Sequence, residues 1–505
     1  MSNIVEEDLV VVSNTFGEIY SKAKSQKEKR EIGQFFTPQH IAEYMAKLST
    51  FSESKKMRIL DPGCGNLILS VNLIQTLVVK GKVSYIELDL YETDLKLEEN
   101  IQSMVTAMRE FLESLGIGFK CNIILKDFVL ENAKYINSDF LNKYDIIISN
   151  PPYFKLPKDD PKSIATQQIN GGFPNIYSMF LAICSNMLNQ KGEMIFIVPR
   201  SFTSGLYFKK FRKYFLSHVN IKSIHLFQNR NDTFKKDQVL QELLILKAVN
   251  KPVDQVYISS SSTLLDDISV KSYGYKEIYD IADDNSYIFI PTNITEDKIL
   301  RIVSSWKNKL EDFGITISTG PVVDFRTKEN IFKSSNDVEN LKPYFRLNNV
   351  TQMKLEWPLN SLVKGQYIHG NNSTKSILRA NENYIFLRRQ SAKGDSNRLI
   401  CSPYYKDDYQ IDFIGIDNKL NYLYSKNRSL TAEEIFGLSA LLNSAFMNSY
   451  FQIFNGNINV SASEIKELKF PSYDVLIDIG KKISKDKLTD ISIINAYINE
   501  KINYE

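Results

Sequence analysis

The chain has 505 residues, of which 43% are hydrophobic and 24% are charged, and its formal net charge is only +3. This composition is that of a soluble globular protein, and no run of about 18 apolar residues is present that could span a membrane. The length exceeds what one hydrophobic core supports, so we expect two or three domains. The small net charge neither requires nor excludes nucleic acid, and any basic surface must be local.

The cysteines and the first residues indicate a reducing cytoplasm. Cys64, Cys121, Cys184 and Cys401 are scattered without paired spacing, so we expect neither disulfides nor a zinc site. Residues 1–8 are acidic and lack the apolar core of a signal peptide. We therefore expect a cytoplasmic protein.

A helical stretch and a capped helix come first along the chain. Residues 1–30 form an N-terminal helical segment whose charged end is typical of a solvated helix face. Thr37 and Pro38 then predict a helix start, with a side-chain cap followed by proline at the first helical position. Phe35 and Phe36 either form an apolar wall near a ligand or simply belong to this well-capped helix.

A short strand over residues 57–60 leads into a glycine turn that suits a ligand. Asp61 ends the strand, and Gly63 and Gly65 follow it two residues apart. Glycines let the backbone approach a ligand closely, and the helix predicted for residues 67–79 presents free amides at its start. The dinucleotide fingerprint needs three glycines, so it is not present. The acid instead suits the cationic amine of an amino-acid group.

Acids also follow the next two predicted strands. Glu92 comes directly after residues 83–91, where an acid is placed to bind ribose hydroxyls. Asp127 and Phe128 follow the strand predicted for residues 122–126. This pair can hydrogen-bond and flank an adenine ring.

The fourth predicted strand, residues 144–149, ends in a rigid polar motif. Asn150, Pro151, Pro152 and Tyr153 follow its apolar run, and neither proline can donate to a sheet ladder, so the strand must stop there. The motif offers two acceptors, the Asn150 amide oxygen and the Pro151 carbonyl, and a flat ring in Tyr153. These groups suit a nucleobase or an amide side chain, although a simple Pro-Pro turn would give the same pattern.

Strands predicted at residues 194–199, 221–227 and 240–247 complete an alternation of strands and helices. This alternation predicts an α/β fold with a Rossmann-like, doubly wound mixed sheet over residues 31–250. Phe234, on the basic segment between the last two strands, either closes the second wall of a pocket or packs on its own hairpin.

The strong strand pattern ends there, so residues 251–290 are predicted to be a connecting region and residues 291–505 a second, α+β domain. Basic residues outnumber acids between residues 371 and 400, and they include Arg379, Arg388, Arg389, Lys393 and Arg398. Such side chains contact phosphates or read guanine edges. The alternative is a solvated surface that acids elsewhere compensate.

In this order, the motifs resemble those of S-adenosylmethionine-dependent DNA adenine-N6 methyltransferases, in which cofactor motifs precede a target-recognition domain. The matching segments are residues 33–38, 61–65, 92, 127–128 and 150–153. The resemblance implies a class I methyltransferase fold with S-adenosylmethionine as the cofactor. The chain departs from the pattern at Asn66, Leu67 and Ile68, where many relatives carry glycine or serine.

The resemblance also implies a role for each matching residue in cofactor binding. Those residues are Phe36, Thr37 and Pro38 at the methionine moiety, Asp61 at its amine, Gly63 and Gly65 in the loop, Glu92 at the ribose, and Asp127 and Phe128 at the adenine.

At the proline motif, the resemblance implies that an adenine flipped out of the duplex is held for methylation. Hydrogen bonds from its N6 to Asn150 and to the Pro151 carbonyl, beside Pro152, would point the nitrogen lone pair at the methyl group. Tyr153 and Phe234 would stack on the two faces of the base. No metal is required.

The implied partner is double-stranded DNA, and the implied enzyme is a monomer that modifies DNA in a restriction-modification system. We see no nuclease motif in the sequence, so any restriction endonuclease is expected on a separately encoded chain. Two alternatives stay open. One is a DNA-binding methyltransferase subunit of a larger phage-defence complex, and the other is methylation of a protein glutamine or of RNA by the same motif.

Overall fold

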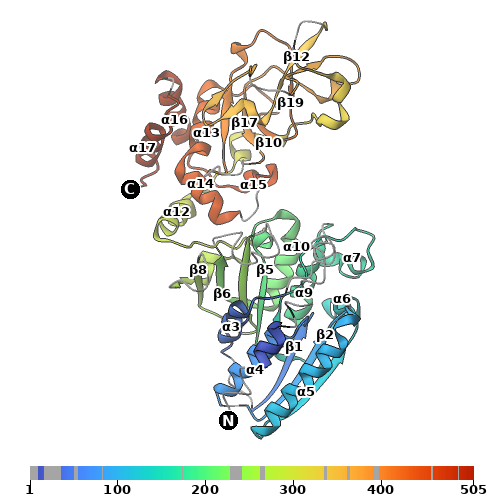
Figure 1. The fold of residues 1–505 in the computed structure, drawn as a ribbon. Helices are drawn as coiled ribbons and strands as arrows, with labels where there is room; N and C mark the ends of the chain where they lie inside the picture. Colours follow the sequence, from blue (N-terminus) through green and yellow to red (C-terminus); the bar gives the residue numbers. More distant parts are fainter. Residues whose placement is uncertain are drawn as a thin grey trace. The chain divides into compact units, whose positions relative to one another are not determined.

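The computed structural model describes residues 9–15, 17, 36–50, 55–81, 83–172, 174–227, 242–261, 268–334, 338–360, 364–390, 397–455, 459–486 and 488–504. The chain forms two compact units, Met1–Thr292 and Asn293–Glu505 (Figure 1).

The first unit is built on one mixed sheet of nine strands in the order β3-β2-β1-β4-β5-β7-β6-β8-β9. The strands are β1 (Lys56–Pro62), β2 (Tyr85–Tyr91), β3 (Gly118–Ile124), β4 (Tyr144–Ser149), β5 (Leu188–Pro199), β6 (Asn220–Phe227), β7 (Leu243–Val249), β8 (Gln255–Ser261) and β9 (Ser269–Gly274). β1 to β5 pair in parallel, and β7 runs antiparallel to both β5 and β6. The prediction of an α/β fold with a doubly wound mixed sheet is confirmed.

The order of the strands reverses at the centre of this sheet. β1 pairs with β2 on one side and with β4 on the other, so the chain moves outward through β2 and β3 before it returns through β4 and β5. In open α/β sheets, ligands bind at the carboxyl ends of the strands at such a reversal. The end of β4, where Asn150 follows Ser149, therefore lies at the expected ligand edge.

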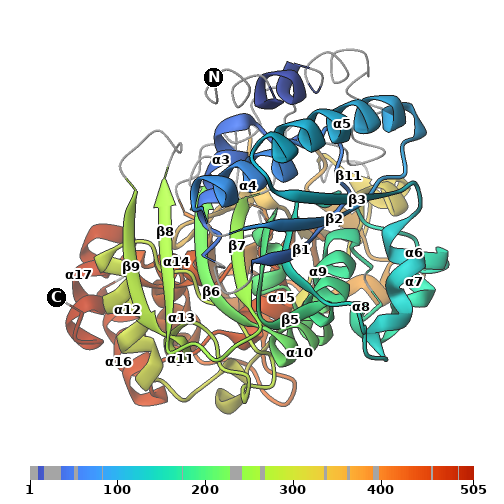
Figure 2. The ribbon, with the colours of Figure 1, turned by 90° about the horizontal axis from the view of Figure 1, so that it is seen from below.

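Helices cover both faces of the sheet (Figure 2). A first apolar cluster joins one face of the strands to α3 (Gln39–Lys47), α4 (Ile68–Val79) and α5 (Glu98–Ser114). A second cluster joins the other face to α9 (Ile176–Asn186) and α10 (Lys209–His218). The strands are buried on both sides because successive side chains alternate between the two clusters. Ile146 and Ile148 lie in the first cluster, and Ile147 lies in the second.

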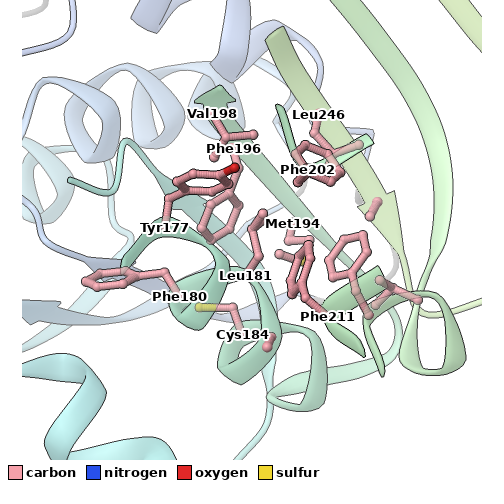
Figure 3. Packing of buried hydrophobic residues seen from close by; sticks show 14 of the residues in the cluster. Tyr177, Phe180, Leu181, Cys184, Met194, Phe196, Val198, Phe202, Phe211 and Leu246 are labelled. Atoms are coloured by element: carbon pink, nitrogen blue, oxygen red, sulfur yellow. The ribbon is translucent and has the colours of Figure 1, made fainter. Parts of the chain in front are cut away.

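Aromatic and aliphatic side chains of α9, β5 and α10 meet in the second cluster (Figure 3). Phe180 and Leu181 of α9 pack there beside Met194 and Phe196 of β5, and Phe211 of α10 closes the group. This packing fixes α9 against the sheet, so the start of the helix is held close to the carboxyl end of β4.

A buried ion pair between β5 and β7 anchors the carboxyl end of α3. The Lys247 ammonium lies 2.8 Å from the Glu193 carboxylate, and both side chains are buried. Lys247 also donates to the Leu48 carbonyl and to the Thr50 hydroxyl, both at 2.7 Å. Glu193 accepts from the Thr50 amide at 2.9 Å. The network thus holds the helix whose other end carries residues 36–38.

Breaking this pair should strongly destabilise the first unit. We expect Lys247→Met to lower the free energy of unfolding by about 3–5 kcal/mol, because Glu193 is left as an uncompensated buried charge. Lys120→Met is the matched control, since Lys120 pairs with Glu87 on the surface, where an ion pair contributes little to stability. Urea unfolding of both variants provides the measurement, and equal losses in the two would contradict the role of Lys247.

Two stretches of the first unit differ from the sequence prediction. The strand predicted for residues 122–126 is β3, which begins at Gly118 and ends at Ile124. β3 is an edge strand, and it carries polar side chains such as Lys120, which pairs with Glu87 on β2. Its sequence therefore lacks a clear alternation of apolar and polar residues. Residues 251–290 do not only connect two domains, because they add β8 and β9 to the sheet.

The second unit is α+β. Its sheets have the strand orders β10-β20-β17-β18 and β11-β15-β12-β19-β16, with β13 and β14 forming a separate pair. Its strands are β10 (Thr316–Thr319), β11 (Ile331–Phe332), β12 (Leu341–Phe345), β13 (Val350–Thr351), β14 (Lys354–Leu355), β15 (Tyr367–His369), β16 (Leu378–Ala380), β17 (Tyr384–Arg388), β18 (Cys401–Tyr404), β19 (Phe413–Ile416) and β20 (Leu420–Tyr424). Its helices are α12 (Ile294–Ser305), α13 (Ala432–Asn443), α14 (Ala445–Phe454), α15 (Ala462–Glu467), α16 (Tyr473–Asp486) and α17 (Ile491–Lys501). Among the helices in the described ranges, none is both long and apolar enough to cross a membrane.

Candidate active site

A cavity of about 640 Å³ lies where the sequence motifs come together. Its walls are formed by residues just before α3, by the loops that follow β1, β2, β3 and β4, and by the side chains of Ile176 and Phe180 on α9. This is the reversal point of the strand order, so the fold and the motifs indicate the same site.

The loop after β1 approaches the ligand edge closely because it contains glycines with positive φ. Gly63 has φ +104° and Gly65 has φ +54°, and both line the cavity. The amides of Gly63 and Cys64 both donate to the Tyr91 carbonyl at 2.9 Å. A Cβ atom at Gly65 would lie 3.0 Å from the Phe36 ring. The glycines therefore allow the loop to pack directly against Phe36.

Glu92 joins the loops that follow β1 and β2. One of its carboxylate oxygens accepts from the Gly65 amide at 3.0 Å, and the other accepts from the Thr93 and Asp94 amides at 2.7 and 2.9 Å. A carboxylate has about four acceptor positions, so capacity remains for a donor in the cavity, which Glu92 lines.

Asp61 lies behind the glycine loop and is fully buried. One oxygen accepts from the Ser70 hydroxyl at 2.6 Å. The other has no hydrogen-bond partner among the described residues. Burial raises the pKa of Asp61 to about 7, with the Ser70 hydrogen bond opposing this shift and Glu92 adding to it. Asp61 is not among the residues that line the cavity, so the structure places it in the supporting layer.

Asp127 and Phe128 form the far wall. Asp127 caps α6 (Phe128–Asn132) by accepting from the Leu130 amide at 3.0 Å, and its other oxygen lies 3.3 Å from the Lys162 ammonium. The Phe128 ring meets Tyr91 edge-on, with centroids 5.1 Å apart, and Phe180 at 5.0 Å. These rings form an apolar wall of the cavity beside a carboxylate.

The proline motif follows β4 as predicted, and Asn150 and Pro152 line the cavity. The Asn150 side-chain nitrogen donates to the Thr37 hydroxyl at 3.0 Å. The Tyr153 hydroxyl donates to the Asn150 amide oxygen and also lies 2.9 Å from the Ile197 carbonyl. The motif is thereby tied both to the segment before α3 and to β5.

The predicted helix start at Thr37 is wrong in detail. Pro38, not Thr37, is the N-cap of α3, and no side chain caps the helix. Thr37 is buried and its hydroxyl accepts from Asn150 instead. The proline still begins the helix, but the threonine side chain serves the contact between two motifs that are 113 residues apart.

The structure brings most predicted site residues into one cavity. The lining includes Phe36, Thr37, Gly63, Gly65, Glu92, Asp127, Phe128, Asn150 and Pro152. Pro38, Asp61, Pro151 and Tyr153 adjoin it without lining it. The Tyr153 ring instead packs with both apolar clusters, and burial raises the pKa of its hydroxyl well above the ordinary value. Phe234 and Phe35 lie outside the described residues.

Sequence reasoning missed four important wall residues: Tyr91, Phe154, Lys162 and Phe180. Tyr91 and Phe154 are next to predicted residues, so neighbourhood alone could have found them. Lys162 and Phe180 come from α7 (Pro161–Ala165) and α9. Tertiary packing brings both to the site, and no local signal predicts it.

The predicted basic residues of the second unit are half-buried. Arg379 donates to the Tyr422 hydroxyl at 2.9 Å, Arg388 to the Val350 carbonyl at 2.7 Å and Arg389 to the Asn418 carbonyl at 2.7 Å. The Arg398 backbone amide donates to the Asn448 side chain at 2.8 Å. The guanidinium groups of Arg379, Arg388 and Arg389 are therefore held in place by protein oxygens. Lys393 lies outside the described residues.

The site can hold a nucleoside joined to an amino acid. The aromatic wall suits a purine, and Glu92 can accept from ribose hydroxyls. Behind the glycine loop, one Asp61 oxygen has no hydrogen-bond partner among the described residues, and a buried carboxylate favours positive charge nearby. Within the described ranges, no group of three or more His, Cys, Asp or Glu side chains is arranged to hold a metal ion. The fold and this cavity are those of a class I S-adenosylmethionine-dependent methyltransferase.

Comparison with known proteins gives the family. Residues 38–234 match the Eco57I restriction-modification methylase family. The chain is 32% identical over 465 residues to the type II methyltransferase M.BsuBI of Bacillus subtilis, covering 90% of both chains. It is 29% identical over 479 residues to the type II methyltransferase M.PstI of Providencia stuartii, covering 94% of both chains. The chain belongs to the type II methyltransferases, and it is a DNA methyltransferase of a restriction-modification system that uses S-adenosylmethionine.

The fold is also similar to that of a solved restriction-modification enzyme. The type IIL enzyme MmeI, in complex with DNA, aligns with a TM-score of 0.58 at 12% identity, over 97% of this chain and 79% of that chain. The alignment covers both compact units of this chain.

Proposed function

We propose that the enzyme transfers a methyl group to N6 of an adenine flipped out of double-stranded DNA. The observation that carries this proposal is the position of Asn150 at the end of β4, in the wall of the cofactor cavity and next to two prolines. An amide oxygen and a neighbouring backbone carbonyl form two acceptors at one corner. That pair suits an exocyclic amino group with two protons.

The Asn150 amide oxygen and the Pro151 carbonyl would accept the two N6 protons of the base. The Tyr153 hydroxyl donates to the same Asn150 oxygen and thereby orients the amide. The hydrogen bonds from N6 localise the nitrogen lone pair and direct it at the cavity. S-adenosylmethionine, when bound, supplies a methyl group on a positively charged sulfur. The nitrogen that accepts it then loses a proton to water, so no strong base is needed.

Base flipping costs a few kcal/mol of lost pairing and stacking. Stacking on aromatic rings returns about 1–3 kcal/mol per base. We propose that Tyr153 and Phe234 supply these rings, with Pro152 fixing the corner that holds Tyr153.

We propose that residues in and beside this cavity bind S-adenosylmethionine. Phe36, Thr37 and Pro38 would contact the methionine moiety, and Glu92 the ribose hydroxyls. Asp127 and Phe128 would contact the adenine, while the loop of Gly63 and Gly65 passes close to the cofactor. Asp61 would stabilise the cationic amine from behind the loop.

The raised pKa of Asp61 predicts a pH-dependent affinity for S-adenosylmethionine. Because this acid has a pKa of about 7, it is largely protonated at pH 6 and ionised at pH 8, and only the ionised form attracts an ammonium group. We expect the Kd to fall as the pH rises from 6 to 7.5, and Asp61→Asn to remove this dependence. Isothermal titration calorimetry with S-adenosylmethionine at several pH values is the test. A wild-type Kd that does not change over this range would contradict the role of Asp61.

We propose that residues 293–505 recognise the DNA sequence, with Arg379, Arg388, Arg389, Lys393 and Arg398 among the contacts to phosphates or bases. The support is that this part forms a compact unit of its own and presents arginines fixed by protein oxygens. A separately encoded restriction endonuclease would act at the same sequence. Free cysteines at all four positions support a location in the cytoplasm, together with the DNA.

Sequencing of DNA from cells that express the chain, with single-molecule detection of modified bases, tests the proposed function. We expect N6-methyladenine at one position of one short sequence, in nearly every copy. Modified cytosine, or adenine methylation without a sequence context, would contradict the proposal. Unmodified DNA together with a methylated protein or RNA would favour the alternative substrates.

A further inference from the structure

The amino-terminal helix is bonded directly to the cofactor loop. The Ser13 hydroxyl donates to the Asn66 carbonyl at 2.6 Å, and the Asn66 side-chain nitrogen donates back to the Ser13 carbonyl at 3.0 Å. Both residues are buried, with exposed fractions of 0% and 3%. Asn66 lines the cofactor cavity and Ser13 does not. The reciprocal pair therefore connects a segment 53 residues away to the wall of the site.

The helix also fits closely around Asn66. A Cβ atom added at Gly17 would lie only 2.4 Å from the Asn66 side-chain nitrogen. Leu9 and Val10 belong to the same buried apolar cluster as Cys64 and Leu67. Residues 9–15 and Gly17 thus pack onto the loop through apolar burial, through two hydrogen bonds and through a position without a side chain.

The loop needs such support because its backbone is strained. Leu67 is the N-cap of α4 and has φ +66° and ψ +10°, in the left-handed region. For a residue with a side chain this conformation is unfavourable, because Cβ lies too close to the following carbonyl oxygen. Gly63 and Gly65 also have positive φ, which glycine adopts readily because it has no Cβ. Leu67 has a side chain, so the same conformation is unfavourable there. Asn66 lies between Gly65 and Leu67, so its hydrogen bonds act at the strained point.

We propose that Ser13 and Asn66 are positioning residues for the cofactor, and that the amino-terminal helix holds the loop of residues 63–67 in its binding conformation. Without the pair, the loop relaxes away from the left-handed conformation at Leu67, and S-adenosylmethionine has to restore that conformation when it binds. The cost then appears in the affinity for the cofactor rather than in the chemical step.

Ser13→Ala tests the pair without touching the cavity. The loss of one hydrogen bond is worth about 0.5–1.5 kcal/mol, which corresponds to a rise of about 2–12-fold in the Kd. We expect this rise for S-adenosylmethionine and for S-adenosylhomocysteine in calorimetry, with kcat at saturating cofactor within about twofold of the wild type. Ser185→Ala is the matched control, because Ser185 is a buried serine that donates to the Ala182 carbonyl away from the cavity.

Gly17→Ala separates positioning from general stability. Alanine favours a helix over glycine, so a purely structural role of this helix predicts unchanged or tighter cofactor binding. The proposal predicts the opposite for the cofactor. The new methyl group displaces the Asn66 amide, the Kd rises by about 2–12-fold, and amides of residues 63–68 exchange hydrogen faster in the cofactor-free enzyme.

These variants decide the proposal together. Weaker cofactor binding in Gly17→Ala, with Ser185→Ala unchanged, supports it even if Ser13→Ala does not fold. An unchanged Kd in a folded Gly17→Ala variant overturns it. So does an equal loss of affinity in Ser185→Ala, since the effect would then reflect the stability of the whole unit.

Discussion

Asn150→Ala is expected to reduce the methylation rate by about 1,000-fold while the enzyme still binds S-adenosylmethionine. Removal of one preorganised hydrogen-bonding group at a developing charge costs about 10²–10³ in rate, and this substitution also removes one of the two acceptors of the Tyr153 hydroxyl. Asn150 contacts Thr37 through its nitrogen, so we expect the Kd for the cofactor to change by less than about threefold. A filter assay with tritiated cofactor and a DNA fragment containing the recognition sequence measures the rate.

Asn186→Ala is the control for Asn150. Asn186 is another partly buried amide of the first unit, and it donates to the Ser138 carbonyl away from the cavity. Its truncation should leave the rate within about threefold. An Asn150→Ala enzyme that retains more than a tenth of the wild-type rate would show that the amide does not hold the reacting nitrogen.

The two roles of Tyr153 are separable at the same site. Tyr153→Phe removes only the hydroxyl that donates to Asn150, so we expect a modest loss of rate. Tyr153→Ala removes the ring as well, and the loss should approach that of Asn150→Ala if the ring stacks on the base. Equal rates in the two variants would assign the effect to the hydroxyl alone.

Glu92→Ala should raise the Kd for S-adenosylmethionine by about 100-fold. The variant loses the carboxylate that we assign to the ribose hydroxyls, and hydrogen bonds to charged groups contribute about 1.5–3 kcal/mol each. It also leaves the amides of Gly65, Thr93 and Asp94 without their acceptor, so the loops after β1 and β2 lose their common anchor. Calorimetry with the cofactor provides the measurement.

Glu87→Ala is the matched control on the same strand. Glu87 pairs with Arg58 and Lys120 on the surface and does not line the cavity. Its cofactor affinity should equal that of the wild type. If Glu92→Ala folds and binds the cofactor within about twofold of the wild type, the assignment of Glu92 is wrong.

The sequence predicts the centre of the fold well because local signals there agree. The apolar run of residues 146–148 followed by two prolines fixes the end of β4, and the glycines at positions 63 and 65 fix the turn after β1. Both signals arise from backbone restrictions that hold in any context. They place each half of the site at the carboxyl end of a strand, whereas the pairing of β1 with β4 is seen only in the folded structure.

Other parts of the site depend on packing that no local pattern contains. Thr37 lies where the sequence predicts a helix cap, yet in the folded chain its hydroxyl accepts from the Asn150 side chain. The sequence predicts Asp61 and Tyr153 as site residues, but their side chains lie beside the cavity rather than in its lining. Lys162 and Phe180 reach the wall from helices that follow the motif, so only the folded structure identifies them.

The assignment with the greatest consequence is that Asn150 and Pro151 hydrogen-bond to the amino group of an adenine flipped out of the duplex. Mass spectrometry of nucleosides, after purified enzyme has methylated DNA with a deuterated-methyl cofactor, tests it most directly. We predict labelled N6-methyldeoxyadenosine from the wild type and only background from Asn150→Ala. A label on cytosine, or the same adenine label from both enzymes, would contradict it.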